Sequence, residues 1–369
     1  MRKYLEHPFE YLKNKNNRDF PSDVIRNWYK ARAFVLDRFK EVAFKADEKQ
    51  HLHVILKGDS GLMLSVARHV ALYAHYLNYD EGKRENRTVI TIVSNASEIE
   101  NTLKKEEYLN NLLNYCKWTH GNTTHNKDSY IDIEINVVSN CDKEENGNVI
   151  VIEESDIISF CSSKLEGEIY SIDTRKAVYA SRMYNLGTLI ENLPAENIHD
   201  TNRYTLALDL FLTERLEEPL DSLINDSDWK SKQIKVKEGL SNIFCADCFE
   251  SRALSIELYR KEETQKDAEL WAKHNEVLSK SEHARWVVEK LIMGFRPLNL
   301  EERLTDEVLS IKKVMRKEKR KDLKQSMDKL AHIDLCSYSD LRRINPDDLK
   351  YDSFLMLAIP GILAKVKQL

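Results

Sequence analysis

Three side chains able to hold an aromatic, phosphate-bearing ligand lie close together in the stretch "SEHARWVVEKLIMGF", residues 281–295. At about 100° per residue, His283, Trp286 and Lys290 fall on one face of the predicted helix, beside its apolar stripe. An aromatic face next to a cation and an imidazole can stack a nucleobase and contact its phosphate. The alternative is a half-buried tryptophan that packs on a neighbouring helix, as most tryptophans do. The spacing alone leaves both interpretations open.

The other residues of this helix divide into an inward and an outward set. The predicted apolar stripe consists of Ala284, Val287, Val288, Leu291 and Phe295. The same periodicity predicts that the charged side chains of Glu282, Arg285 and Glu289 face away from that stripe.

A second candidate site is the glycine turn "KGDSG", which stands where a predicted strand leads into a predicted helix. Backbone N–H groups at such a helix N-terminus can face an anion. The dinucleotide fingerprint G-x-G-x-x-G is incomplete, because Ser60 and Met63 stand at its second and third glycine positions. The carboxylate of Asp59 would also repel phosphate. We expect either a modified nucleotide site lined by Gly58, Asp59, Ser60 and Gly61, or a turn whose glycines serve backbone geometry alone.

No named catalytic signature is present: the sequence holds no G-x-S-x-G elbow, H-E-x-x-H pair, P-loop or kinase set. Cys245 and Cys248 have metal-like spacing, but a lone C-x-x-C in a helical stretch favours a structural role. Catalytic groups often converge from distant segments, so an enzyme is not excluded and the cofactor stays unknown, with a nucleotide or dinucleotide as the candidate ligand.

Composition limits the classes of partner. The 369 residues carry a net charge of −5, which argues against generic nucleic-acid coating. No apolar run reaches the roughly 18 to 20 residues of a membrane span, and the N-terminus has no apolar signal region. The six cysteines are scattered and are interpreted as reduced thiols. We therefore expect a cytoplasmic protein that does not bind membranes.

The segment after residue 50 is predicted to be an open, largely parallel α/β sheet, because β-branched strands alternate with helical stretches. The predicted helices of this part cover 62–79 and 97–118, and the polar stretches 119–130 and 141–148 are expected to be loops or insertions. The predicted strands are 51–58, 87–94, 130–139, 148–154 and 166–172.

From about residue 174 onward the pattern becomes helical, and no Gly/Pro/Ser-rich linker separates the parts. We expect an N-terminal helical segment (1–48), an α/β domain (49–240) and a helical domain (241–369) that pack together. The strongly basic run 310–329 is expected to be a solvated helix face, with a local phosphate-binding edge as the alternative.

The histidine–tryptophan helix resembles the signature helix of the RyR domain, the small repeat first found in ryanodine receptors and also present in bacterial proteins. That pattern has His, two residues, Trp, and then Gly-aromatic eight residues after the Trp. His283, Trp286, Gly294 and Phe295 match in register, and Lys290 stands where an Arg is common.

The second half of the RyR pattern, H-P-x-L-V-P-Y-x-x-L, is similar to "HIDLCSYSDL". The matching positions are His332, Leu335, Tyr338 and Leu341, whereas Ile333 and Ser337 replace the prolines. In the closing acidic-basic step Asp352 is kept and Ser353 stands for Arg. The resemblance covers about 281–358, roughly a fifth of the chain.

The order of the parts resembles a bacterial arrangement in which a Rossmann-like domain, similar to the NAD-binding domain of potassium-channel regulators, precedes a RyR domain. The resemblance implies a sensor that binds a small nucleotide-derived signal in bacterial signalling or antiviral defence. His283, Trp286, Lys290, His332 and Tyr338 would then face the ligand, and binding would change assembly or partner engagement. A nucleotide- or NAD-consuming enzyme and a protein-interaction scaffold remain the alternatives, and homo-oligomerisation is left open.

Overall fold

The computed structural model of the chain describes most of the two predicted domains. The described residues are 22–94, 107–141, 148–170, 172–192, 236–256, 264–298, 331–344 and 348–368, with the single residues 103, 219 and 222. The predicted helix in 202–224, apart from those single residues, and the basic run 310–329 lie outside this part of the chain.

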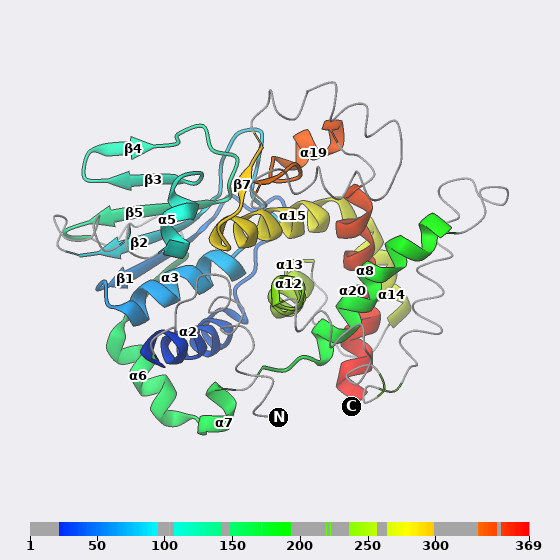
Figure 1. Cartoon of the computed structure of the whole chain (residues 1–369), viewed down its shortest axis with the longest axis horizontal. Helices are drawn as coiled ribbons and strands as arrows, with labels where there is room; N and C mark the ends of the chain where they lie inside the picture. The colour runs from blue at the N-terminus through cyan, green and yellow to red at the C-terminus, as the bar shows by residue number, and fades with distance from the viewer. Residues whose placement is uncertain are drawn as a thin grey trace.

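Six strands form one largely parallel sheet in the order β4-β3-β5-β2-β1-β6 (Figure 1). Only the β3–β4 pair is antiparallel. The predicted mixed α/β architecture and its largely parallel sheet are confirmed. The strands are β1 (Leu52–Lys57), β2 (Thr88–Val93), β3 (Lys117–His120), β4 (Thr123–His125), β5 (Ile133–Val138) and β6 (Asn148–Glu153). A separate two-residue pair joins β7 (Arg296–Pro297) and β8 (Ala331–His332).

The helices form two groups along the chain, one before and one after residue 174. Those of the first part are α2 (Ser22–Phe39), α3 (Gly61–Tyr73), α5 (Glu107–Leu113), α6 (Glu154–Ser163) and α7 (Glu166–Ile169). Those of the second part are α8 (Arg175–Asn192), α12 (Val236–Asp247), α13 (Phe249–Ser255), α14 (Thr264–Lys273), α15 (Asn275–Ile292), α19 (Tyr338–Ile344) and α20 (Leu349–Gln368).

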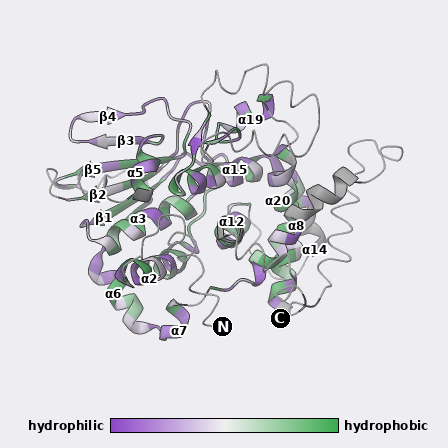
Figure 2. Cartoon of the chain, viewed as in Figure 1, coloured by the Kyte–Doolittle hydropathy of each residue, from purple (hydrophilic) through white to green (hydrophobic). Residues whose placement is uncertain are grey.

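Helix α3 lies at the centre of the main core. All of its residues from Leu62 to Tyr73 are buried, because the sheet covers one side and α2, α12 and α15 pack around the rest (Figures 1 and 2). A helix that is covered all round needs apolar residues on every face, and "GLMLSVARHVALY" supplies them. The N-terminal helix α2 is anchored by the buried side chains of Trp28, Phe34, Val35 and Phe39.

Helix α15 connects two cores. Its residues Val287, Val288 and Leu291 belong to the sheet core, whereas Leu278, near its start, belongs to a second core. In that second core α8 packs against α12 and α20 (Figure 1). The two parts of the chain therefore share a continuous interface along α15.

The structure corrects the end of one predicted helix and the type of one predicted strand. The helix predicted for 62–79 ends at Tyr73, because the Ala74 carbonyl accepts a hydrogen bond from Thr88 Oγ1 and the chain then turns towards β2. The stretch 166–172 was predicted as a strand, but its residues 166–169 form the short helix α7. There the Glu168 carboxylate accepts a hydrogen bond from the Leu165 N–H at 2.8 Å and caps the first turn.

The polar stretch 119–130 was predicted as a loop, but its first part forms a hairpin of β3 and β4. Gly121 adopts φ +56° in the connecting turn, a conformation in which glycine carries no steric penalty. Trp118 lies opposite His125, and their rings stack with centroids 4.3 Å apart. This cross-strand pair stabilises a hairpin that hydropathy alone does not indicate.

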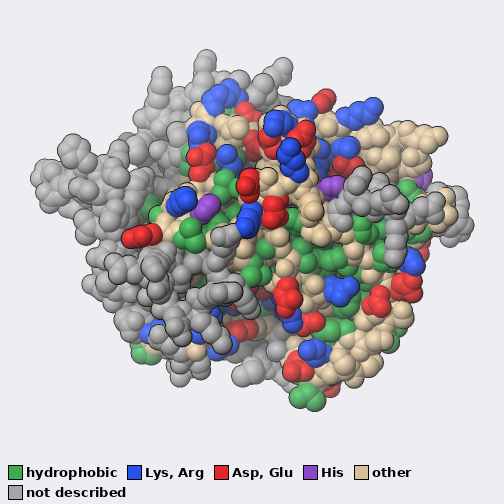
Figure 3. All heavy atoms as spheres, turned by 180° about the vertical axis from the view of Figure 1, so that it is seen from behind, with side chains coloured by type: hydrophobic (Ala, Val, Ile, Leu, Met, Phe, Trp, Pro, Cys, Tyr) green, Lys and Arg blue, Asp and Glu red, His purple; other side chains and the backbone are tan. Residues whose placement is uncertain are grey.

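The face seen from behind carries Lys/Arg and Asp/Glu side chains interspersed, with hydrophobic side chains between them (Figure 3). This mixture accords with the small net charge of −5.

Candidate functional site

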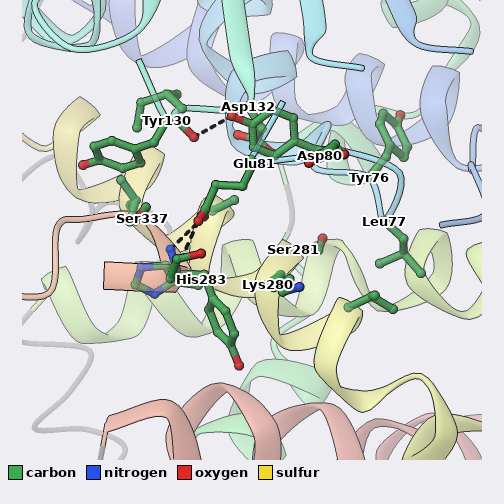
Figure 4. Close-up of a pocket in the computed structure, with 18 of the residues that line it drawn as sticks. Tyr76, Leu77, Asp80, Glu81, Tyr130, Asp132, Lys280, Ser281, His283 and Ser337 are labelled. Atoms are coloured by element: carbon green, nitrogen blue, oxygen red, sulfur yellow. Dashed lines mark hydrogen bonds between the residues drawn. The ribbon is translucent and has the colours of Figure 1, made fainter. Parts of the chain in front are cut away.

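A cavity of about 360 Å³ lies between helix α15 and the segment that joins α3 to β2. Residues 76–82 and 130–132 line one side, and residues of α15 together with 336–339 line the other (Figure 4). Because the first two segments directly precede β2 and β5, the cavity lies at the amino-terminal edge of the parallel strands. We call it the amino-edge cavity. Its volume falls within the ~300–1,000 Å³ of small-molecule sites.

His283 lines this cavity with a ring that is fixed at both nitrogens. Nε2 lies 2.8 Å from the carbonyl oxygen of Cys336, and Nδ1 lies 3.6 Å from Oδ2 of Asp352 on α20. Burial lowers the pKa of His283, but the Asp352 carboxylate and the Cys336 side chain outweigh burial and raise it to about 10. His283 is therefore protonated at neutral pH, and it presents ring surface rather than a free nitrogen.

The five residues predicted from the RyR-like pattern lie together. The rings of His283 and Trp286 stack with centroids 6.0 Å apart, and Tyr338 meets His283 edge-on at 5.8 Å. His332 lies edge-on to Trp286 at 5.0 Å, and Lys290 Nζ is 5.6 Å from the Trp286 ring centroid. His283 and Tyr338 line the amino-edge cavity, whereas half-buried Trp286 lies behind them and is not one of its lining residues.

The buried pair of His75 and Asp132 lies next to the amino-edge cavity, just before β5. His75 Nδ1 is 2.8 Å from Asp132 Oδ2, and both side chains are almost completely buried. Asp132 Oδ1 has no hydrogen-bond partner among the described residues, and neither do His75 Nε2 and the hydroxyl of Tyr76. Asp132 and Tyr76 both line the cavity. Buried polar atoms without partners are uncommon, and several at one cavity are a mark of a binding site.

The charges around the cavity are mainly negative. Asp80, Glu81 and Asp132 contribute carboxylates. The positive groups are the protonated His283 and the ammonium group of Lys280, which also pairs with Glu276 at 3.4 Å. The backbone N–H of Lys83 is the main cause that holds the pKa of Asp80 below its usual value. The Glu81 carboxylate accepts hydrogen bonds from the N–H groups of residues 338 and 339, at 2.8 and 3.1 Å, and so covers the N-terminus of α19.

The opposite face of α15 corrects the sequence analysis. Glu282, Arg285 and Glu289 were predicted to face away from the core, but all three side chains are completely buried. Arg285 donates to both carboxylates, at 2.7–2.9 Å, and Arg252 from α13 donates to Glu282 at 2.6 Å. The helical periodicity was read correctly, but α12 and α13 cover the face that it assigned to solvent. We call these four residues the buried charge cluster.

The buried charge cluster also binds Lys290, the residue predicted to contact the phosphate of a ligand. Lys290 Nζ lies 2.8 Å from Glu289 Oε1, and the Ser241 hydroxyl donates to Glu289 at 2.9 Å. Burial raises the pKa of Glu282, but the positive charges of Arg285 and Arg252 dominate and lower it to about 2. The ammonium group of Lys290 therefore contacts Glu289 and the Trp286 ring within the protein itself.

The glycine turn lies at the other edge of the sheet, because it follows the carboxyl end of β1. Ser60 caps α3, since its hydroxyl accepts a hydrogen bond from the Met63 N–H at 3.3 Å. Asp59 Oδ2 accepts from the Ser94 hydroxyl at 2.5 Å, and Lys57 pairs with Glu153 at 2.8 Å. The structure therefore does not bring Gly58, Asp59, Ser60 and Gly61 together with the α15 residues.

Gly58 adopts φ +127°, a region that other residues rarely occupy. Replacement of Gly58 by Ala is expected to lower the free energy of unfolding by about 1–3 kcal/mol. The added Cβ would lie 3.8 Å from Met63, an ordinary contact, so the cost is conformational. Chemical denaturation of Gly58→Ala measures this loss.

Gly167→Ala is the matched control, because its Cβ meets nothing within 4 Å and no positive φ opposes the substitution. Equal losses in the two variants would contradict this explanation.

Sequence reasoning missed Tyr76, Asp132, Lys280 and Ser281. The signal for Asp132 was its place in "YIDIEI", where a carboxylate interrupts an isoleucine-rich strand start. Its partner His75 was placed on the helix that in fact ends at Tyr73. Their pairing joins segments 57 residues apart, and no local pattern reveals such a contact.

Comparisons with protein-family models, curated proteins and solved structures gave no match. Within the described ranges, no helix has the length and apolar character needed to cross a membrane. The same residues contain no group of three or more His, Cys, Asp or Glu side chains placed to hold a metal ion. Cys245 and Cys248 are buried in α12 and directly before α13.

Proposed function

We propose that the chain binds a small nucleotide or nucleotide-derived ligand in the amino-edge cavity. The observation that carries this proposal is the cavity itself, where Asp132 Oδ1 and the hydroxyl of Tyr76 have no partner within the described part of the chain. Tyrosines 76, 79, 130 and 338 add the aromatic surface on which a base can stack.

The finer structural assignments belong to this proposal. The order β5-β2-β1-β6 supports a Rossmann-like unit, because it reverses direction at β1 as in doubly wound sheets. The packing of His283 against Tyr338, and of Trp286 against His332, supports a RyR-like unit, because the two half-motifs meet. We propose that the ligand lies between the two units, because residues of both line the amino-edge cavity.

Ligand binding there would act as a signal because both units line the cavity. The Glu81 carboxylate holds the start of α19, and Lys280 and Ser281 belong to α15 (Figure 4). A ligand that prefers one spacing of these elements shifts the population towards that spacing. We propose that this shift changes self-assembly or the binding of a partner protein, as in a bacterial signalling or antiviral defence system.

A nucleotide-consuming enzyme is the second candidate, and the His75–Asp132 pair favours it. A carboxylate that holds one nitrogen of a buried histidine is the usual support of a general base. The pair would use its free Nε2 to accept a proton. Product formation from NAD or a nucleotide by the purified protein would establish this function.

The proposed function is tested by native mass spectrometry followed by thermal-shift and calorimetric titration with nucleosides, nucleotides, NAD and cyclic oligonucleotides. We expect at least one to bind and stabilise the protein, since a ligand at 100 times its Kd adds about 2.7 kcal/mol. Binding should weaken in Ser281→Leu, which fills the cavity, and persist in Ser60→Ala at the opposite edge. Failure of every ligand to bind a folded sample would contradict the proposal and favour an interaction scaffold.

A further inference from the structure

The amino-edge cavity offers one buried acceptor to a ligand. Oδ2 of Asp132 accepts from His75, which leaves Oδ1 without a partner among the described residues, on a side chain only 4% exposed. The Tyr76 hydroxyl, on a side chain 7% exposed, lacks a partner in the same lining. A carboxylate oxygen requires a donor, so the missing group must carry an N–H or O–H.

A phosphate does not meet these requirements. Phosphate sites use backbone N–H groups and Arg or Lys side chains, and here the exposed N–H groups at the start of α19 are already held by Glu81. Asp80 and Asp132 add negative charge, and the single lining lysine, Lys280, stands at the half-exposed rim. The protonated His283 also lines the cavity, but Asp352 already pairs with it. An anion inside the cavity would therefore face carboxylates and one cation that is already paired.

Resting on the proposed function, we propose that the amino-edge cavity takes the nucleoside end of the ligand. A base amino group or ring N–H donates to Asp132 Oδ1, the Tyr76 hydroxyl makes a second hydrogen bond, and any phosphate stays at the mouth beside Lys280. The cavity thereby selects the base and tolerates variation in the phosphate chain.

The test is isothermal titration of the full chain with the four ribonucleosides and their 5′-mono- and triphosphates. We expect the preferred nucleoside to bind within about threefold of its phosphates. Its analogue, in which C–H replaces the donor, should bind at least about tenfold more weakly, because Asp132 Oδ1 is then buried against a non-donor.

Two variants address the side chains directly. Asp132→Asn can keep its oxygen towards His75 and turn its NH₂ towards the ligand donor, so affinity should fall by at least about tenfold. Tyr76→Phe should weaken binding severalfold while the melting temperature stays equal or rises, because it removes a buried hydroxyl that lacks a partner and keeps the ring against Phe44. The control Tyr73→Phe removes a buried hydroxyl that does not line the cavity, and it should leave affinity unchanged.

The outcomes separate the two levels of the argument. Tight binding of triphosphates with inorganic tripolyphosphate as a competitor, and no binding of nucleosides, would overturn the inference and leave the proposed function standing. Full affinity in folded Tyr76→Phe and Asp132→Asn would also overturn it. No binding by any nucleoside or nucleotide would instead remove the proposed function.

Discussion

Replacement of Glu282 by Gln is expected to lower the free energy of unfolding by about 3–5 kcal/mol at neutral pH. Glu282 accepts hydrogen bonds from Arg252 and Arg285 at 2.6–2.9 Å, and all three side chains are buried. The variant keeps the shape of the side chain but leaves the positive charges of both buried arginines short of a partner. Breaking a buried ion pair from one side is far more costly than its net contribution to folding.

The measurement is urea denaturation, with Glu276→Gln as the matched control on the same helix. Glu276 pairs with Lys280 and Arg342 at the surface, so its loss should cost less than about 1 kcal/mol. Below pH 4.5 the wild type should itself lose stability as the pH approaches 2, because the pKa of Glu282 is lowered to about 2 and its stabilisation requires the ionised form. A loss below 1 kcal/mol in Glu282→Gln would contradict the structural role of the buried charge cluster.

The second large effect is a loss of stability at alkaline pH that depends on His283. Its pKa rises from 6.5 to about 10 in the folded protein, because the attraction of Asp352 and Cys336 outweighs burial. A raised pKa stabilises the fold fully below 6.5, and the stabilisation disappears as the pH rises through 10. We expect the wild type to lose about 2 kcal/mol or more between these values, since one pKa unit corresponds to about 1.4 kcal/mol.

The His283→Gln variant should show a much flatter profile over the same range, measured by urea denaturation at several pH values. His69→Gln is the control, because burial and the charge of Arg68 lower the pKa of His69 and keep it neutral throughout. Tyr338 beside His283 does not interfere, since burial raises its pKa to about 12. A slope of equal size in His283→Gln and the wild type would show that another group titrates.

The sheet could be predicted because most of its strands are short apolar runs in the sequence. The segments "HLHVILK", "RTVITIV" and "NVIVIE" are apolar runs with β-branched residues. Such runs are typical of parallel strands, and β1 and β2 are largely buried whereas β6 lies at the edge of the sheet. The hairpin of β3 and β4 escaped because its stability comes from the stacking of Trp118 on His125, a contact that spacing rules do not contain.

The candidate site was predictable only in part. Helical periodicity and the RyR-like pattern predicted His283 and Tyr338 as site residues, because each half of that pattern is a short continuous stretch of sequence. Asp132 and Tyr76 come from segments far apart in the sequence. The sheet brings them to the same cavity, so no local pattern identifies them. The burial of Glu282 and Arg285 likewise depends on α12 and α13 covering α15, and a charged helix face without a visible partner is ordinarily solvated.

The central claim is that a nucleoside occupies the amino-edge cavity, and a crystal structure of the protein with its best-binding nucleoside tests this claim most directly. We expect the ligand between Asp132 and helix α15, with a base N–H within hydrogen-bond distance of Asp132 Oδ1 and the Tyr76 hydroxyl in contact. A ligand bound instead at Gly58–Gly61, at the carboxyl edge of β1, would contradict the claim.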